Sequence, residues 1–122
     1  MTLQFLPQTF SVAKIPHTAS IPEGDFVFTG RTDAEYSLLC PTSSVPSDAH
    51  IREDGWRGLR IAGQLDFSLI GILSRISAVL AEAEVGIFAV STCDTDYNFL
   101  KEENLDRAKE ALAAAGYEIR QI

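Results

Sequence analysis

The sequence predicts an α+β protein built as two tandem lobes, in which antiparallel sheets carry helices on one face. Two observations lead to this class. The second half of the chain shows strand and helix patterns in the order βαββαβ, and the first half repeats that order with degenerate helical segments. This order is that of the ferredoxin-like fold. We place the first lobe at residues 1–57 and the second at residues 58–122.

The first strand and helix of the second lobe follow from the spacing of apolar residues. Residues 58–65 read as a strand, and apolar residues then recur at helical spacing, which predicts a helix over about residues 69–83. Asp66 and Ser68 precede this segment, and short oxygen-bearing side chains commonly cap helices. We therefore expect one of these two residues to be the N-cap.

The rest of the second lobe reads as a hairpin, a helix and a strand. Residues 87–92 and 96–101 are rich in aromatic and branched side chains, which predicts two paired strands. Apolar residues at helical spacing predict a second helix over about residues 103–115, and Gly116 follows at the usual C′ position. Residues 117–122 then form the closing strand.

A weak internal repeat supports the two-lobe interpretation. A shift by half the chain length aligns TDAEYSLL (32–39) with CDTDYNFL (93–100). The same shift aligns GWRGLRI (55–61) with GYEIRQI (116–122). Both halves therefore show an acidic turn between two strands and, later, a glycine followed by an aromatic residue and a strand. The alternative is that two unrelated hairpins with acidic turns happen to look alike.

The first lobe is a thinner version of this pattern. Residues 3–15 predict a strand interrupted by Pro7, and residues 26–30 and 35–40 predict a hairpin. Proline is costly inside a helix. Because of the prolines in the intervening segments, we expect single turns there instead of full helices: Pro22, Pro41 and Pro46.

Composition limits the classes of function. The chain has 122 residues and a net charge of −7, and an acidic protein repels the phosphate backbone of nucleic acids. No apolar run approaches the roughly 20 residues of a membrane helix, and we expect no signal peptide. The two cysteines, Cys40 and Cys93, show no pair spacing, which favours a reducing cytoplasm. His17 and His50 lie without ligand spacing around them, so we predict neither a metal nor a cofactor.

The segments QLDFSLIGILSRISAVLAEA (64–83) and IFAVSTCDTDYNFLKEENLDRAKEALAAAGY (87–117) resemble the ACT domain. The likeness is to aspartate kinase regulatory modules and to cytosolic arginine-sensing proteins, and the first lobe resembles a divergent ACT-like partner. The resemblance implies a non-enzymatic regulatory module that binds a small molecule, an amino acid in our reading, and that forms a homodimer. The open alternatives are a ligand-free dimerisation module and, third, an enzyme.

The resemblance also implies a site between a helix start and a hairpin. Free N–H groups at a helix start attract a carboxylate, and a carboxylate in the hairpin suits an ammonium group. The candidate ligand-binding residues at the helix start are Asp66, Phe67, Ser68, Leu69, Ile70 and Gly71. Those in the hairpin are Ser91, Thr92, Cys93, Asp94, Thr95 and Asp96.

Each of these residues also has a purely structural interpretation. Asp94 and Asp96 can hold the glycine-free turn by bonding its backbone. For Asp66 the structural interpretation is that it caps the helix without binding a ligand. For Gly71 it is that the residue permits close packing without contacting a ligand. The turn at residues 32–36 can be a relic second site.

Two residues depart from the family pattern. Glu84 stands where such sequences carry a glycine after the first helix. A non-glycine residue in the left-handed region costs about 1 kcal/mol, so we expect this helix exit to be shaped differently. Cys93 stands where an aromatic residue is common. If that aromatic side chain lines the family's pocket, the pocket here is smaller or differently shaped.

Overall fold

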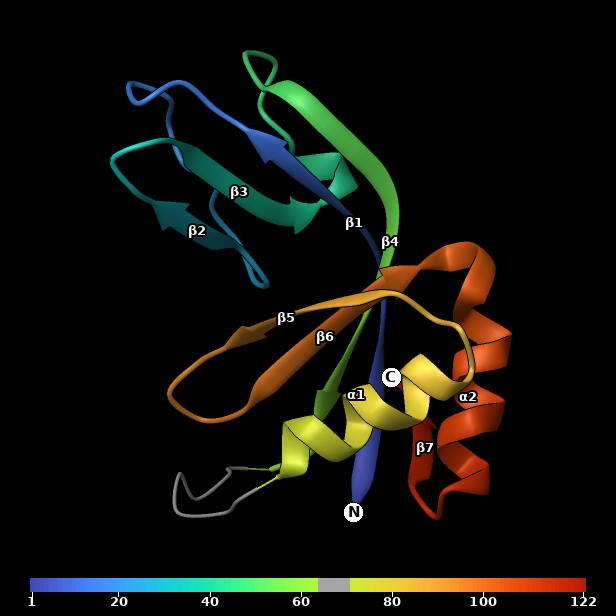
Figure 1. Cartoon of the computed structure of the whole chain (residues 1–122). Coiled ribbons are helices and arrows are strands. Elements are labelled where there is room, and N and C mark those ends of the chain that lie inside the picture. Colours follow the sequence, from blue (N-terminus) through green and yellow to red (C-terminus); the bar gives the residue numbers. More distant parts are fainter. Residues whose placement is uncertain (64–70) are drawn as a thin grey trace. The chain divides into compact units, whose positions relative to one another are not determined.

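The computed structural model describes residues 1–63 and 71–122, which divide into two compact units. Unit 1 contains Met1–Pro7 and Arg57–Ile122, and unit 2 contains Gln8–Trp56. The protein is a mixed α/β structure with antiparallel strand pairs and two α-helices in its described part (Figure 1). Neither of these two helices is long and apolar enough to span a membrane.

Unit 1 has the element order that its sequence predicts. After the end of strand β4 (His50–Ile61), the elements are α1 (Ile72–Glu82), β5 (Ile87–Ser91), β6 (Asp96–Lys101), the 3₁₀ turn η2 (Glu102–Asn104), α2 (Leu105–Ala114) and β7 (Glu118–Gln121). The hairpin pairs β5 with β6 in antiparallel register, with Ile87 opposite Leu100. The βαββαβ order of this half is therefore present.

The sheet of unit 1 contains an additional strand from the start of the chain. Its order is β5-β6-β4-β1-β7. The first residues of β1 (Thr2–Lys14) pair in parallel with β7, with Thr2 opposite Glu118 and Phe5 opposite Gln121. The N-terminal residues therefore complete the sheet of unit 1 and separate β4 from β7.

The core of unit 1 lies between the sheet and its two helices. The helices α1 and α2 pack beside each other (Figure 1). The apolar stripe of each helix supplies fully buried side chains to this core, which also includes residues of β1, β4 and β6. The buried side chains from the helices are Ile76, Leu80, Ala108 and Leu112. The helical periodicity of the sequence thus identified the core-facing stripes.

The start of α1 differs from the prediction. The helix begins at Ile72, and its N-cap is Gly71, with φ +80° and no side-chain capping hydrogen bond. The predicted capping role of Asp66 or Ser68 is therefore wrong, and both residues lie outside the described residues. Glycine suits this position because it has no Cβ to clash in the left-handed region.

The end of α1 does not have the different shape expected from the missing glycine, because Glu84 adopts the left-handed conformation that glycine usually takes there. The φ of Glu84 is +61°, in the left-handed region. The N–H of Val85 donates to the carbonyl of Leu80 at 2.9 Å, which is the 6→1 bond that closes a helix end. The guanidinium of Arg107 donates to the carbonyls of Ala83 and Glu84 at 2.8 and 3.0 Å. Arg107 thus holds the carboxyl end of α1 from α2.

Unit 2 is a four-stranded sheet with no α-helix. Its strand order is β2-β3-β1-β4, where β2 spans Phe28–Arg31 and β3 spans Tyr36–Pro41. One 3₁₀ turn, η1 (Thr42–Ser44), follows β3, which confirms the expected single turn. Without helices, unit 2 is not a complete ferredoxin-like lobe, so the tandem arrangement stays an interpretation. Loop residues cover the small core of this unit, which is formed by Ile15, Leu38 and Cys40.

Two strands run through both units. The predicted break of the first strand at Pro7 is wrong, because β1 continues from Thr2 to Lys14. Proline lacks only its own N–H donor, so a strand can accommodate it where no ladder bond needs that donor. Pro7 nevertheless marks the last β1 residue of unit 1. Likewise, β4 begins at His50, earlier than residue 58, and enters unit 1 at Arg57.

Candidate functional site

A threonine holds the acidic turn between β5 and β6. The N–H of Thr92 donates to the carbonyl of Thr95 at 2.9 Å. The hydroxyl of Thr92 accepts the N–H of Thr95 at 3.3 Å and donates to its carbonyl at 3.1 Å. A side chain that bonds nearby backbone in this way replaces the conformational freedom of glycine. This explains how the chain reverses without a glycine.

The two carboxylates of this hairpin differ in their surroundings. Asp96 is half-buried, and one of its oxygens accepts the hydroxyl of Ser91 at 2.5 Å. This bond links opposite residues of the hairpin, in agreement with the structural interpretation of Asp96. Asp94 is exposed, and so is the free thiol of Cys93. The turn therefore presents negative charge at the surface.

Thr95 fastens this turn to the neighbouring strand. Its side chain is buried, with 7% exposure, and its hydroxyl donates to the carbonyl of Ile61 at 3.0 Å. Ile61 is the last residue of β4, so the turn lies where β4 ends and the chain leads to α1 (Figure 1). Gly63 and Gly71, on either side of the undescribed segment, both have positive φ, +84° and +80°.

Of the ligand-binding residues predicted at the helix start, the structure describes Gly71 alone. The predicted residues Asp66, Phe67, Ser68, Leu69 and Ile70 lie outside the described residues. A cavity of about 240 Å³ adjoins the first turn of α1, and its lining contains none of the predicted hairpin residues. This cavity is lined by Met1, Ile72, Arg75, Ala115, Gly116 and Tyr117. That the helix start and the hairpin together form one ligand site therefore remains a proposal.

A buried amide lies close to the acidic turn in the sequence of β6. The side chain of Asn98 is fully buried, and neither its oxygen nor its nitrogen has a hydrogen-bond partner in the described structure. Successive side chains of a strand alternate between its two faces. Asn98 therefore shares a face of β6 with Asp96 and with Leu100, which belongs to the core under the helices. Sequence analysis missed this residue, and its position between apolar neighbours was the available signal.

The first hairpin repeats the geometry of the second. The N–H of Thr32 donates to the carbonyl of Glu35 at 2.9 Å, and the Thr32 hydroxyl accepts the N–H of Glu35 at 3.1 Å. These are the bonds that Thr92 makes with Thr95. Thr32 therefore corresponds to Thr92, so the repeat in the hairpins is slightly shorter than half the chain, which corrects the predicted alignment.

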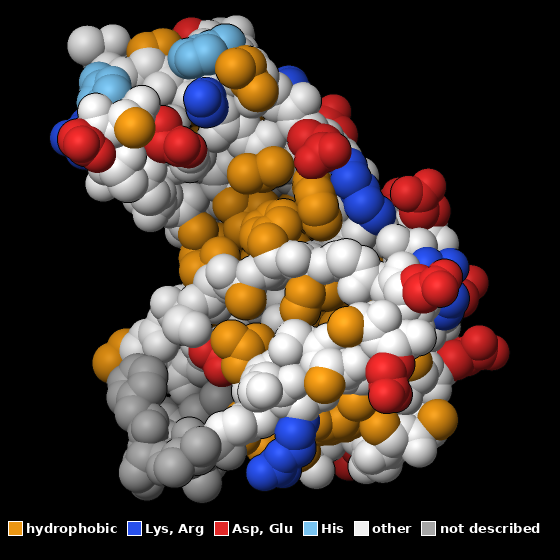
Figure 2. Space-filling model, viewed as in Figure 1, with side chains coloured by type: hydrophobic (Ala, Val, Ile, Leu, Met, Phe, Trp, Pro, Cys, Tyr) orange, Lys and Arg blue, Asp and Glu red, His pale blue; other side chains and the backbone are white. Residues whose placement is uncertain are grey.

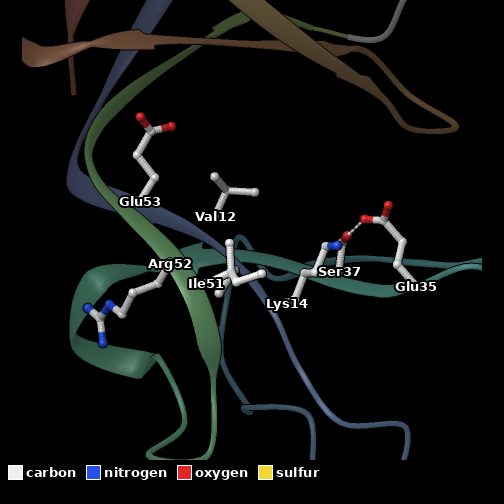
Figure 3. Close-up of a pocket in the computed structure, with 8 residues that line it drawn as sticks. Val12, Lys14, Glu35, Ser37, Ile51, Arg52 and Glu53 are labelled. Atoms are coloured by element: carbon white, nitrogen blue, oxygen red, sulfur yellow. Dashed lines mark hydrogen bonds between the residues drawn. The ribbon is translucent and has the colours of Figure 1, made fainter.

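Unit 2 contains a larger cavity that sequence analysis did not assign. Its volume is about 450 Å³, and three segments that are distant in the sequence line it (Figure 3). The lining residues are Val12, Ala13, Lys14, Glu35, Ser37, Ile51, Arg52 and Glu53. The only signal in the sequence was the acidic turn at residues 32–36, which was weighed as a second site. On the face shown in Figure 2, acidic and basic side chains are interspersed.

The fold defines the chain as a small α+β module that contains a βαββαβ unit. The family model of the ACT domain matches residues 51–114, which is more than half of the chain. The protein therefore belongs to the ACT domain family.

Solved structures show a similar fold over nearly the whole chain. The chain is similar to protein Atu0741 from Agobacterium tumefaciens, with 29% identity, a TM-score of 0.87, and coverage of 99% of this chain and 92% of that chain. The regulatory subunit of aspartate kinase from Thermus thermophilus has 10% identity, a TM-score of 0.68 and coverage of 95% and 97%. The corresponding values for VC0802 from Vibrio cholerae, a possible transport protein of unknown function, are 13%, 0.70, 93% and 88%. The identities of these last two proteins are low, so their likeness shows the fold alone. No curated protein matches the sequence.

Proposed function

We propose that this protein is a non-enzymatic regulatory module that binds an amino acid beside the acidic turn of unit 1. The observation that carries the proposal is this turn, which Thr95 fastens to the end of β4 in a chain of the ACT family. The proposal includes tandem ACT-like lobes at residues 1–57 and 58–122, a cytoplasmic location, and no metal or cofactor.

The chemistry of the turn suits the ammonium group of an amino acid. Asp94 and Asp96 supply two carboxylates within three residues, and an ammonium group requires acceptors and an anion. The bond from Ser91 occupies one oxygen of Asp96 and fixes the orientation of the carboxylate. The amide of Asn98, on the same face, adds both a donor and an acceptor. The N-terminus of α1, beginning after Gly71, suits the carboxylate of the ligand.

Thermal unfolding in the presence of each common amino acid at millimolar concentration tests this function. A ligand at 100 times its Kd raises the free energy of unfolding by about 2.7 kcal/mol. With an unfolding entropy of about 2.1 cal/mol/K per residue, this corresponds to about 10 °C for a chain of this length. The absence of a shift with every amino acid would contradict the proposal.

A pair of charge variants locates the response. Asp96→Asn keeps an oxygen that accepts the Ser91 hydroxyl but removes the charge, so we expect at least tenfold weaker binding in isothermal titration calorimetry with a nearly unchanged unfolding temperature. The matched control is Asp48→Asn, on an exposed loop of unit 2. Equal Kd values for the two variants would show that the turn is not the site.

The second candidate function is a ligand-free dimerisation module. The strands β2 and β5 end the described strand order, and an exposed sheet edge can pair with another chain. We propose a homodimer in either case, so sedimentation should give about twice the chain mass of 13.3 kDa. Loss of the amino acid response in Asp96→Asn with an intact dimer supports the binding function. A dimer that never responds to any amino acid supports the second candidate.

A further inference from the structure

One surface of unit 2 carries both a cavity and an exposed apolar side chain. The cavity has a volume of about 450 Å³, and all of its lining residues belong to unit 2. Ile51 is one of these lining residues, and its exposure of 72% is the highest among the large hydrophobic residues described. An interface between two identical chains requires a surface that is complementary to itself. A hollow with an apolar side chain beside it meets this requirement in shape.

We propose that this surface of unit 2 is a homodimer interface. Ile51 of each copy enters the cavity of the other copy, and Lys14 of each copy forms an ion pair with Glu35 of the other. With two-fold symmetry each of these contacts occurs twice. The inference rests on the proposed homodimer and names the residues that hold it. The sheet edges β2 and β5 are the alternative surfaces.

Two opposite charges at the cavity are available for these ion pairs. Lys14 is exposed and forms no ion pair with any residue among 1–63 and 71–122. Glu35 is half-buried and accepts the hydroxyl of Ser37 (Figure 3), and a carboxylate has lone pairs for further donors. Lys14 lies opposite Ser37 in the pairing of β1 with β3, so the cation and the anion belong to one sheet face. A second copy turned by 180° can therefore place each charge against the opposite one.

The net charge of the lining also favours a second copy as the partner. Two cationic and two anionic side chains line the cavity, whereas the whole chain has a net charge of −7. Two copies with the same net charge repel each other. Contact through a surface whose charges sum to zero adds least to this repulsion. A strongly charged partner of another kind finds no net attraction there.

The backbone of Ile51 is a separate indication of a functional position. Its φ of +47° lies in the left-handed region, which a β-branched residue rarely adopts. Strained conformations of this kind persist where the surrounding structure enforces them, and they cluster at functional sites. Packing of Ile51 against Val12 and Ala13 of the other copy removes its apolar surface from water, which favours association.

Charge reversal followed by sedimentation equilibrium of the full chain tests the ion pairs. Lys14→Glu places like charges opposite each other, and so does Glu35→Lys. We therefore expect each variant alone to have a dimer dissociation constant raised about tenfold or more. An equimolar mixture of the two variants should recover the wild-type value, because each changed charge then faces an opposite charge. The double variant Lys14→Glu/Glu35→Lys should recover it for the same reason.

Matched controls change the net charge by the same amount in unit 1. Arg75→Glu on α1 and Glu110→Lys on α2 alter exposed residues and should leave the dissociation constant unchanged. Circular dichroism establishes that each variant is folded. If the variants at Lys14 and Glu35 dimerise as the controls do, or if their mixture recovers nothing, the ion pairs are overturned.

Methyl NMR of the unmodified chain tests the apolar contact without any variant. On dilution through the dissociation range, the methyl signals of Val12 and Ile51 should shift together with the dimer fraction. The methyl signals of Leu112, which is fully buried in the core of unit 1, should not move. If the signals of Val12 and Ile51 stay fixed while the dimer dissociates, the interface is overturned.

The same measurements separate this inference from the proposed function. A chain that sediments as a monomer at every concentration overturns the interface and the homodimer, while thermal unfolding with amino acids still decides the binding function. A dimer that is insensitive to Lys14, Glu35 and dilution of the Ile51 signal overturns this interface alone and assigns dimerisation to another surface.

Discussion

Gly58 is a position where one added methyl group should disturb the contact between β4 and β6. A Cβ atom at this residue would lie 2.8 Å from Cε1 of Phe99 and 3.3 Å from Cδ1 of Leu6. Phe99 is fully buried and stacks on Phe88 with ring centroids 5.2 Å apart. Its ring therefore has little room to move away from the new methyl group.

The expected cost of Gly58→Ala is the difference between two effects. Overpacking a close-packed core costs about 1–3 kcal/mol. Replacing glycine by alanine at an ordinary φ stabilises a protein by about 0.4–1 kcal/mol, because it lowers the conformational entropy of the unfolded chain. Gly58 is not one of the glycines with positive φ, so this gain applies to it. We therefore expect a net loss of about 1–2 kcal/mol. At about 2.1 cal/mol/K per residue, this lowers the midpoint of thermal unfolding by about 4–8 °C.

Circular dichroism melts and urea unfolding measure this loss. The matched control is Gly30→Ala on β2, where an added Cβ meets no atom close enough for contact. The double variant with Phe99→Leu should show a coupling energy of about 0.5 kcal/mol or more, because the shorter side chain makes room for the methyl group. If Gly58→Ala melts at or above the wild-type temperature, the steric argument is refuted.

Three further predictions concern the helix end, the turn and the thiols. Glu84→Gly should raise the free energy of unfolding in urea by up to about 1 kcal/mol, because glycine tolerates positive φ; a decrease would show that the side chain stabilises the fold. Thr95→Val should lower it by about 0.5–1.5 kcal/mol, because the bond to the Ile61 carbonyl is lost, whereas an unchanged value would mean that this bond is not needed. Burial raises the pKa of the Cys40 thiol, with Arg52 opposing, so mass spectrometry should find native-state iodoacetamide labelling at the exposed Cys93 alone. Rapid labelling of Cys40 at neutral pH would contradict this labelling prediction. The raised pKa of Cys40 also implies a contribution to the free energy of unfolding that is present below the ordinary thiol pKa of about 8.5 and is lost as pH rises through the raised value.

The hairpin and the core-facing stripes were predictable because they depend on local sequence. Periodic apolar residues predicted both helices of unit 1, and α2 (Leu105–Ala114) lies within the predicted residues 103–115. The acidic turn was also predicted, because polar residues separate two short apolar segments. Its closure by Thr92 follows from the tendency of threonine to bond nearby backbone.

Long-range pairing decided the remaining features. Nothing local in Thr2–Phe5 indicates that these residues pair with β7, which lies at the opposite end of the chain. The cavity of unit 2 likewise exists only because β1, β3 and β4 bring Lys14, Ser37 and Ile51 to one place. The sequence by itself determined the helices and the hairpin of unit 1 and the family. Only the tertiary structure decided which strands became neighbours and where a cavity remained, because hydrogen-bond partners and packing volume are set by residues far apart in the chain.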